Sequence, residues 1–105
     1  MLDSPLLIKS KAFALDIIRV CNDIKQNKRE SVLTNQLIRS GTSIGANIRE
    51  TFYAHGKADF ISKRHIALKE AAETEYWLKL LILSEYITEG MGNSLLKDCL
   101  GSRES

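Results

Sequence analysis

Two stretches of the chain decide the fold: residues 35–50, NQLIRSGTSIGANIRE, and residues 59–78, DFISKRHIALKEAAETEYWL. In both stretches apolar residues recur every three or four positions, which is the period of one face of an α-helix. Leu37, Ile44 and Ile48 form such a stripe in the first stretch. No run of alternating apolar and polar residues, the pattern of a half-buried strand, occurs in the sequence. The sequence therefore predicts an all-α protein.

The same spacing predicts four helices within one domain of 105 residues, over residues 5–26, 31–54, 58–87 and 93–100. Ser4 and Pro5 suit the cap and first position of the first helix, and the second helix is expected to start near Ser31. Three long helices joined by short turns pack as an antiparallel up-down bundle. The fourth helix is expected to stop at Gly101, after about two turns, with Ser102–Ser105 loose. The apolar groove that it leaves would favour self-association.

Composition agrees with a small globular protein: 44% of residues are apolar, 27% are charged and the net charge is only +2. The start of the sequence lacks the basic and apolar regions of a signal peptide, and no apolar run is long enough to cross a bilayer. We therefore expect a cytoplasmic protein without a membrane partner. Cys21 and Cys99 have no metal-ligand spacing, and reduced buried thiols are favoured over a disulfide.

The second helix carries Gly41 and Gly45 four residues apart, next to Ser40. Each glycine costs about 1 kcal/mol against alanine in a helix interior, so a compensating contact is expected. We predict that another backbone approaches this face closely. The middle of the third helix is small, at Ala67, Ala71 and Ala72, and could accept this glycine face or a neighbouring subunit.

Two polar residues, Asn47 and Glu75, fall on or beside the buried stripes. They are predicted to form a hydrogen-bonded pair between the second and third helices, with Arg39 or Ser40, because buried polar groups need partners. A ligand pocket is the alternative.

The third helix also carries a cluster of charged residues and two adjacent aromatic residues. Glu70 and Glu73, with Lys69, are predicted to form a solvated face or an ion pair between subunits. Tyr76 and Trp77 are adjacent and point about 100° apart on a helix, so one is expected in the core and the other at an interface.

Basic residues gather where the first helix begins, the second ends and the third begins. Six cations lie at this end, Lys9, Lys11, Arg49, Lys57, Lys63 and Arg64, against three carboxylates, Asp3, Glu50 and Asp59, an excess of three positive charges. A ring of protomers would multiply them into a cationic rim that binds phosphate backbone without reading sequence. The alternative is an ordinary solvated surface.

No catalytic constellation is evident. His55 and His65 are ten residues apart, with no Glu-x-x-His, His-Glu-x-x-His or Cys-x-x-Cys pattern around them. They are predicted to be surface or helix-end side chains. The sequence therefore predicts a protein without enzymatic activity, cofactor, metal ion or small-molecule substrate.

The two opening stretches resemble the four-helix-bundle family of proteins encoded by 23S rRNA intervening sequences. The matching positions include Gln36–Leu37, Arg39–Ser40, Thr42–Ser43–Ile44, Asn47–Ile48, Glu50, Asp59–Phe60, Ala67–Leu68, Glu70, Glu73, Glu75 and Trp77–Leu78. The resemblance covers roughly residues 7 to 88. It implies an all-α bundle that forms homo-oligomers, typically a pentameric ring. A related branch, the accessory proteins of diversity-generating retroelements, contacts nucleic acid through a basic surface.

Two functional hypotheses follow. The first is a non-enzymatic structural or adaptor protein whose ring presents one face to a partner. Its helix-packing or oligomer contacts are expected at Arg39, Ser40, Gly41, Gly45, Asn47, Glu50, Glu75 and Trp77. The second is an RNA- or DNA-binding protein that uses the basic end.

Overall fold

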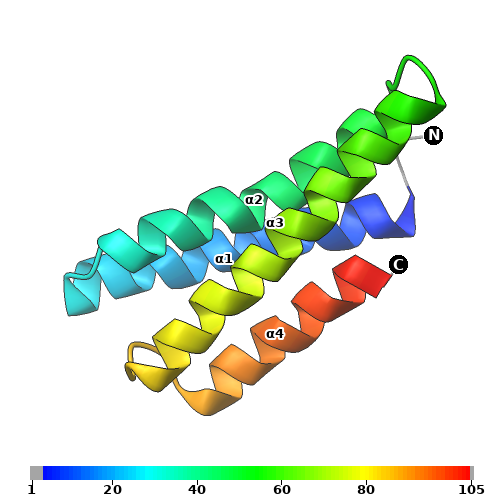
Figure 1. Ribbon diagram of the computed structural model, residues 1–105. Coiled ribbons are helices and arrows are strands. Elements are labelled where there is room, and N and C mark those ends of the chain that lie inside the picture. Colours follow the sequence, from blue (N-terminus) through cyan, green and yellow to red (C-terminus); the bar gives the residue numbers. More distant parts are fainter. Residues whose placement is uncertain (1–3, 105) are drawn as a thin grey trace.

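The structure is a computed structural model that describes the backbone of residues 4–104 and the side chains of residues 4–99. Within this part of the chain there are four helices and no strand (Figure 1). Their bounds are α1 Pro5–Lys28, α2 Val32–Thr51, α3 Lys57–Leu83 and α4 Glu89–Glu104. The predicted all-α antiparallel bundle is confirmed.

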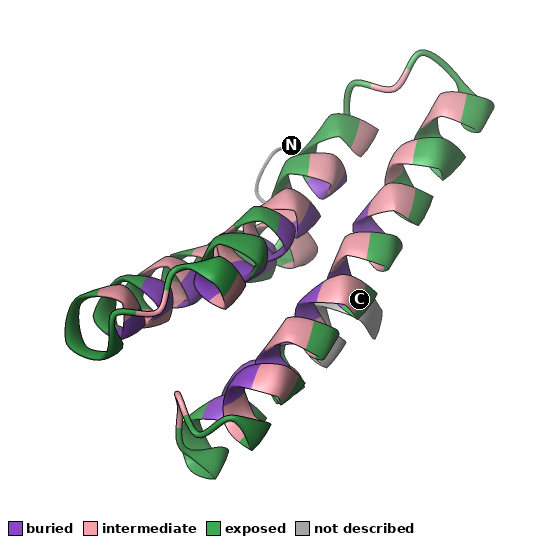
Figure 2. Ribbon diagram, turned by 60° about the vertical axis from the view of Figure 1, so that its left-hand side comes forward, coloured by how far each residue is buried: buried purple, intermediate pink, exposed green. Residues whose placement is uncertain are grey.

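The helices pack as a four-sided bundle with principal extents of 44 × 22 × 19 Å. Each helix contacts its neighbours in the chain, and α4 also contacts α1, which closes the square. The diagonal pairs, α1 with α3 and α2 with α4, make no close backbone approach among the described residues. Figure 2 shows the buried stripes of the helices turned inward.

The core is built from the predicted stripes. Ile17 of α1, Leu37 of α2 and Leu78 of α3 are fully buried, and α4 adds Leu95 and Cys99. Burying an aliphatic side chain of this size stabilises a fold by about 1.5–3 kcal/mol. The core therefore draws on all four helices, and α4 is part of it.

The first helix begins as predicted, whereas the second is capped by an unexpected residue. Ser4 Oγ accepts a hydrogen bond from the Leu7 N–H at 3.1 Å, and Pro5 is the first helical residue. At α2, Ser31 makes no side-chain cap. Instead the Glu30 carboxylate accepts the N–H groups of Leu33 (2.8 Å) and Thr34 (3.0 Å).

The hydrogen bonds at Glu30 have an electrostatic consequence. Burial by itself would raise the pKa of Glu30, but the backbone N–H groups of Leu33 and Thr34 outweigh burial and hold that pKa below its usual value. The carboxylate also lies at the positive end of the α2 dipole. Glu30 therefore stabilises the start of α2 as an anion.

The prediction of a two-turn fourth helix is wrong, because α4 runs over Glu89–Glu104. Thr88 starts it: its Oγ1 accepts the Met91 N–H at 3.1 Å. Gly92 lies inside the helix and is buried, and a Cβ there would collide with Ile82, so this glycine lets α4 approach α3 closely. Gly101 does not end the helix. Residues 102–104, which were predicted to be loose, belong to α4, and Ser105 lies outside the described residues.

The third helix is shorter than predicted. It ends at Leu83, four residues before the expected end. Glu85 takes the left-handed conformation, with φ of 65°, and the Tyr86 N–H returns to the Leu81 carbonyl at 3.0 Å. Tyr86 and Ile87 keep the apolar pattern because they fold back against the core from the turn.

Candidate interaction surfaces

The glycine face of α2 packs against α1. A Cβ at Gly41 would lie 3.1 Å from Ile17, and one at Gly45 would lie 3.1 Å from the Ser10 hydroxyl. The predicted close approach is therefore present, but the neighbour at these glycines is α1, whereas the third helix was expected to accept this face. Helical periodicity shows which face of α2 carries the glycines, but which helix packs on that face depends on how the four helices are arranged in the bundle.

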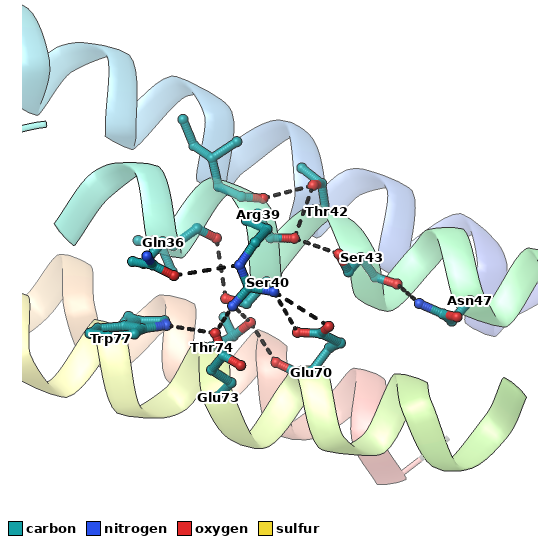
Figure 3. A network of polar contacts seen from close by, with 12 residues as sticks. Gln36, Arg39, Ser40, Thr42, Ser43, Asn47, Glu70, Glu73, Thr74 and Trp77 are labelled. Carbon is teal, nitrogen blue, oxygen red and sulfur yellow. Dashed lines mark hydrogen bonds and ion pairs between the residues drawn. The ribbon is translucent and has the colours of Figure 1, made fainter. Parts of the chain in front are cut away.

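The contact between α2 and α3 is centred on a buried hydroxyl pair (Figure 3). Thr74 Oγ1 lies 2.9 Å from Ser40 Oγ and 2.8 Å from the Glu70 carbonyl. Both side chains are fully buried. Ser40 thus packs α2 against α3, and its partner is Thr74, a residue that the sequence analysis did not single out.

Arg39 lies at the outer edge of the same contact, where it pairs with two carboxylates of α3 (Figure 3). Its guanidinium is 3.3 Å from Glu70 and also pairs with Glu73. Trp77 Nε1 donates to Glu73 at 3.0 Å, which joins the ring to the network. The predicted solvated face at Glu70 and Glu73 is therefore wrong, because both carboxylates pair within the chain. The alternative, a pair between subunits, stays a prediction. Trp77 is half-buried against the core, whereas Tyr76 is 57% exposed.

The predicted pair between Asn47 and Glu75 is not formed. Asn47 Nδ2 donates to the Ser43 carbonyl of its own helix at 2.8 Å. Because Ser40 faces Thr74 and the helices are antiparallel, Asn47 and Glu75 lie about eight residues apart along the bundle, roughly 12 Å. The helical periodicity of the sequence correctly indicated that Asn47 and Glu75 are half-buried. It did not give the register of α2 against α3, and in the observed register the two residues do not face each other.

The six predicted cations do lie at one end of the bundle, where α1 starts and the α2–α3 connection lies (Figure 1). Lys63 Nζ pairs with Glu50 at 3.0 Å, and this hydrogen bond raises the pKa of Lys63. Glu50 thus packs α2 against α3. The other five cations are exposed and form no ion pair with a described side chain: Lys9, Lys11, Arg49, Lys57 and Arg64.

The described carboxylates at this end of the bundle, which offset part of its positive charge, make contacts within the fold. Glu50 is paired with Lys63, and Asp59 accepts the His55 N–H at 3.1 Å in the first turn of α3. Asp3 lies outside the described residues. We call these five cations, together with residues 52–61 of the α2–α3 connection and the start of α3, the basic end.

Exposed apolar side chains of the basic end were missed by the sequence reading. Phe52, Tyr53, Phe60 and Ile61 are all exposed, and Tyr53 is 58% exposed. Phe52, Phe60 and Arg64 line one cavity of about 360 Å³. The signal in the sequence was the density of aromatic residues on both sides of a predicted turn.

Two large apolar side chains are exposed on the outside of α1. Ile8 and Leu15 are 56% and 46% exposed, and they are seven positions apart, so they share one face of α1. Ile8 also lines a groove of about 500 Å³ between α1 and α2, whose lining includes Ala14, Gly45 and Ala46.

The remaining chemistry-bearing residues do not converge. Cys21 and Cys99 are buried; the Cys99 thiol donates to the Ala71 carbonyl at 3.5 Å, and burial raises the pKa of Cys21 to about 12. Among the described residues, no group of three or more His, Cys, Asp or Glu side chains is placed to hold a metal ion. None of the helices in this part of the chain combines the length and apolar character needed to cross a membrane.

Comparisons with known proteins agree with this architecture. A comparison with curated proteins found no match. A crystal structure from Bacteroides thetaiotaomicron VPI-5482, described as a protein of unknown function from the S23 ribosomal protein family, matches with a TM-score of 0.92 and 47% identity. The match covers 94% of this chain and 92% of that chain. The family model of the 23S rRNA-intervening sequence protein matches residues 3–103. Four antiparallel helices and the polar pattern of α2 and α3 thus lead to one conclusion: the chain belongs to the 23S rRNA-intervening sequence protein family.

Proposed function

We propose that the protein is a non-enzymatic bundle that self-associates and serves as a structural or adaptor scaffold. The observation that carries this proposal is the exposed stripe of Ile8 and Leu15 on α1, beside the α1–α2 groove. Large aliphatic side chains repeated on one outer face indicate an interaction surface. A second copy of the chain would remove this stripe from water, and the family resemblance suggests a ring of five.

The test is the mass of the protein in solution, measured by light scattering on a size-exclusion peak. The parent chain is expected to be an oligomer, and Ile8→Glu with Leu15→Glu is expected to reduce its mass while helical circular dichroism is retained. Leu83→Glu is the matched control, because Leu83 is even more exposed but lies at the end of α3. A monomeric parent would remove the proposal.

A second candidate function is nucleic-acid binding at the basic end. Its specific support is that five cations there are exposed and form no ion pair with a described side chain, while the nearby carboxylates Glu50 and Asp59 are engaged. Unneutralised Lys and Arg side chains bind phosphates and release counterions, so affinity falls steeply with salt.

Binding of a fluorescent RNA, followed by anisotropy at two salt concentrations, tests this candidate. Lys57→Glu is expected to weaken binding and to reduce the salt dependence by about one phosphate contact. Lys79→Glu changes an exposed lysine on α3, away from the basic end, and should leave affinity unchanged. Equal binding by parent and Lys57→Glu proteins would contradict the assignment.

A further inference from the structure

The basic end combines its positive charge with exposed flat rings. Four of its large apolar side chains, Phe52, Tyr53, Phe60 and Ile61, are exposed, and three of the four are aromatic. Phe52 and Tyr53 lie in the α2–α3 connection, and Phe60 lies in the first turn of α3, which begins at Lys57. Rings and cations that alternate along a short segment suit a ligand with both bases and phosphates.

The cavity at this end supports the same reading. Its lining includes the rings of Phe52 and Phe60 and the guanidinium-bearing Arg64, and its volume is about 360 Å³. That volume falls in the range of small-ligand sites, so a single unstacked base fits. Ser4 and Thr51 contribute polar groups to the lining, and its other residues are apolar, among them Ala67 and Leu68. A base could therefore contact two rings while its phosphate pairs with Arg64.

We propose that the basic end binds single-stranded nucleic acid, with bases stacking on Tyr53, Phe52 and Phe60 and phosphates pairing with Arg49, Lys57 and Arg64. This inference rests on the second candidate function and names its ligand class. A duplex keeps its bases stacked inside, so it would meet the cations but not the rings. Glu50 is paired with Lys63, so one of the two described carboxylates at this end already has a cation beside it.

The experiment compares three fluorescent probes of about 12 nucleotides, a length within the site sizes of single-strand binders. They are a single strand, the duplex of the same sequence, and a strand of the same length without bases. The single strand is expected to bind most tightly. The probe without bases reports the phosphate contacts alone.

Two tyrosines provide a matched pair of variants. Tyr53 and Tyr76 are 58% and 57% exposed, but Tyr76 lies on the outer face of α3, away from the basic end. Tyr53→Ser is expected to weaken single-strand binding about fivefold to hundredfold, the effect of losing one stacked base. It should not change binding of the probe without bases, and Tyr76→Ser should change neither.

Three other results would each overturn part of the proposal or all of it. Equal binding of the strands with and without bases, with Tyr53→Ser harmless, would remove the stacking while the phosphate-binding function stands. No binding of any probe would remove both. Preferential binding to anionic phospholipid vesicles, with no nucleic-acid binding, would assign the exposed rings to a membrane surface instead.

Discussion

The buried hydroxyl pair between α2 and α3 gives the sharpest stability prediction. Thr74 and Ser40 are fully buried, and their oxygens lie 2.9 Å apart. Thr74→Val keeps the shape of the side chain but removes this hydrogen bond and the bond to the Glu70 carbonyl. Ser40 Oγ then keeps a longer contact to the Leu37 carbonyl at 3.4 Å. Leaving a buried hydroxyl poorly satisfied costs about 1–3 kcal/mol.

Ser40→Ala is expected to cost less, about 0.5–1.5 kcal/mol, because Thr74 retains its bond to the Glu70 carbonyl. The double variant removes both hydroxyls and leaves neither partner unsatisfied. Its loss of unfolding free energy should therefore be smaller than the sum of the two single losses by at least about 0.5 kcal/mol. Urea denaturation followed by circular dichroism, at one fixed protein concentration, measures all four proteins.

Thr34→Val provides the control for this double-mutant cycle. Thr34 is also fully buried, but its hydroxyl donates to the Glu30 carbonyl of its own chain segment at 3.0 Å. It lies six residues from Ser40, about 9 Å along α2, so Thr34→Val and Ser40→Ala should add. Additive losses for Ser40 and Thr74 themselves would refute the reasoning, because the two hydroxyls would then contribute independently.

Three further predictions concern charge and thiol chemistry. Glu30→Ala should lower the unfolding free energy by about 0.5–2 kcal/mol at neutral pH, as for loss of a helix cap. The fold lowers the pKa of Glu30 from 4.5, so the stabilisation by its carboxylate is complete above pH 4.5 and is lost as pH falls through the folded-state pKa. The unfolding free energies of parent and variant should therefore converge when denaturation is repeated at decreasing pH. A difference that stays constant with pH would contradict the cap. Arg39→Ala should cost less than about 1 kcal/mol, since Arg39 is 48% exposed, and the cost should shrink in high salt, which urea titrations at two salt concentrations would show. Cys21 and Cys99 should resist a disulfide reagent at pH about 8 in the native protein and react once guanidinium unfolds it, because the reagent needs an accessible thiolate; rapid native labelling would contradict their burial.

The helices of this protein were predictable because their apolar stripes are regular. Leu37, Ile44 and Leu78 all fall in the core as their spacing indicated. The ends of helices were less predictable, because tertiary contacts decide them. Gly92 would weaken an isolated helix, yet in the bundle it is buried against Ile82 and lies inside α4. Glu85 adopts a left-handed backbone conformation, which a sequence pattern indicates only where a glycine stands.

The interaction surfaces were predictable to a smaller extent. The gathering of cations at one end follows from the order and direction of the helices, so position along the chain was sufficient. Pairing across helices depends on register, which periodicity does not give; for this reason the Glu50–Lys63 pair and the Ser40–Thr74 pair were both missed. Exposure of Tyr53 depends on how α2 and α3 connect, which the sequence pattern does not describe.

The square arrangement of helices has a consequence for the order in which the fold forms and opens. Three of its four sides join helices that are consecutive in the chain, so most contacts close short loops, which favours rapid folding. The fourth side joins α4 to α1, the two ends of the described chain, and is less extensive than the contact of α4 with α3. Detaching α4 therefore breaks the one long-range side and leaves three helices paired in sequence. Amide hydrogen exchange should show α4 opening at a lower free energy than α2 and α3, as a separate cooperative unit.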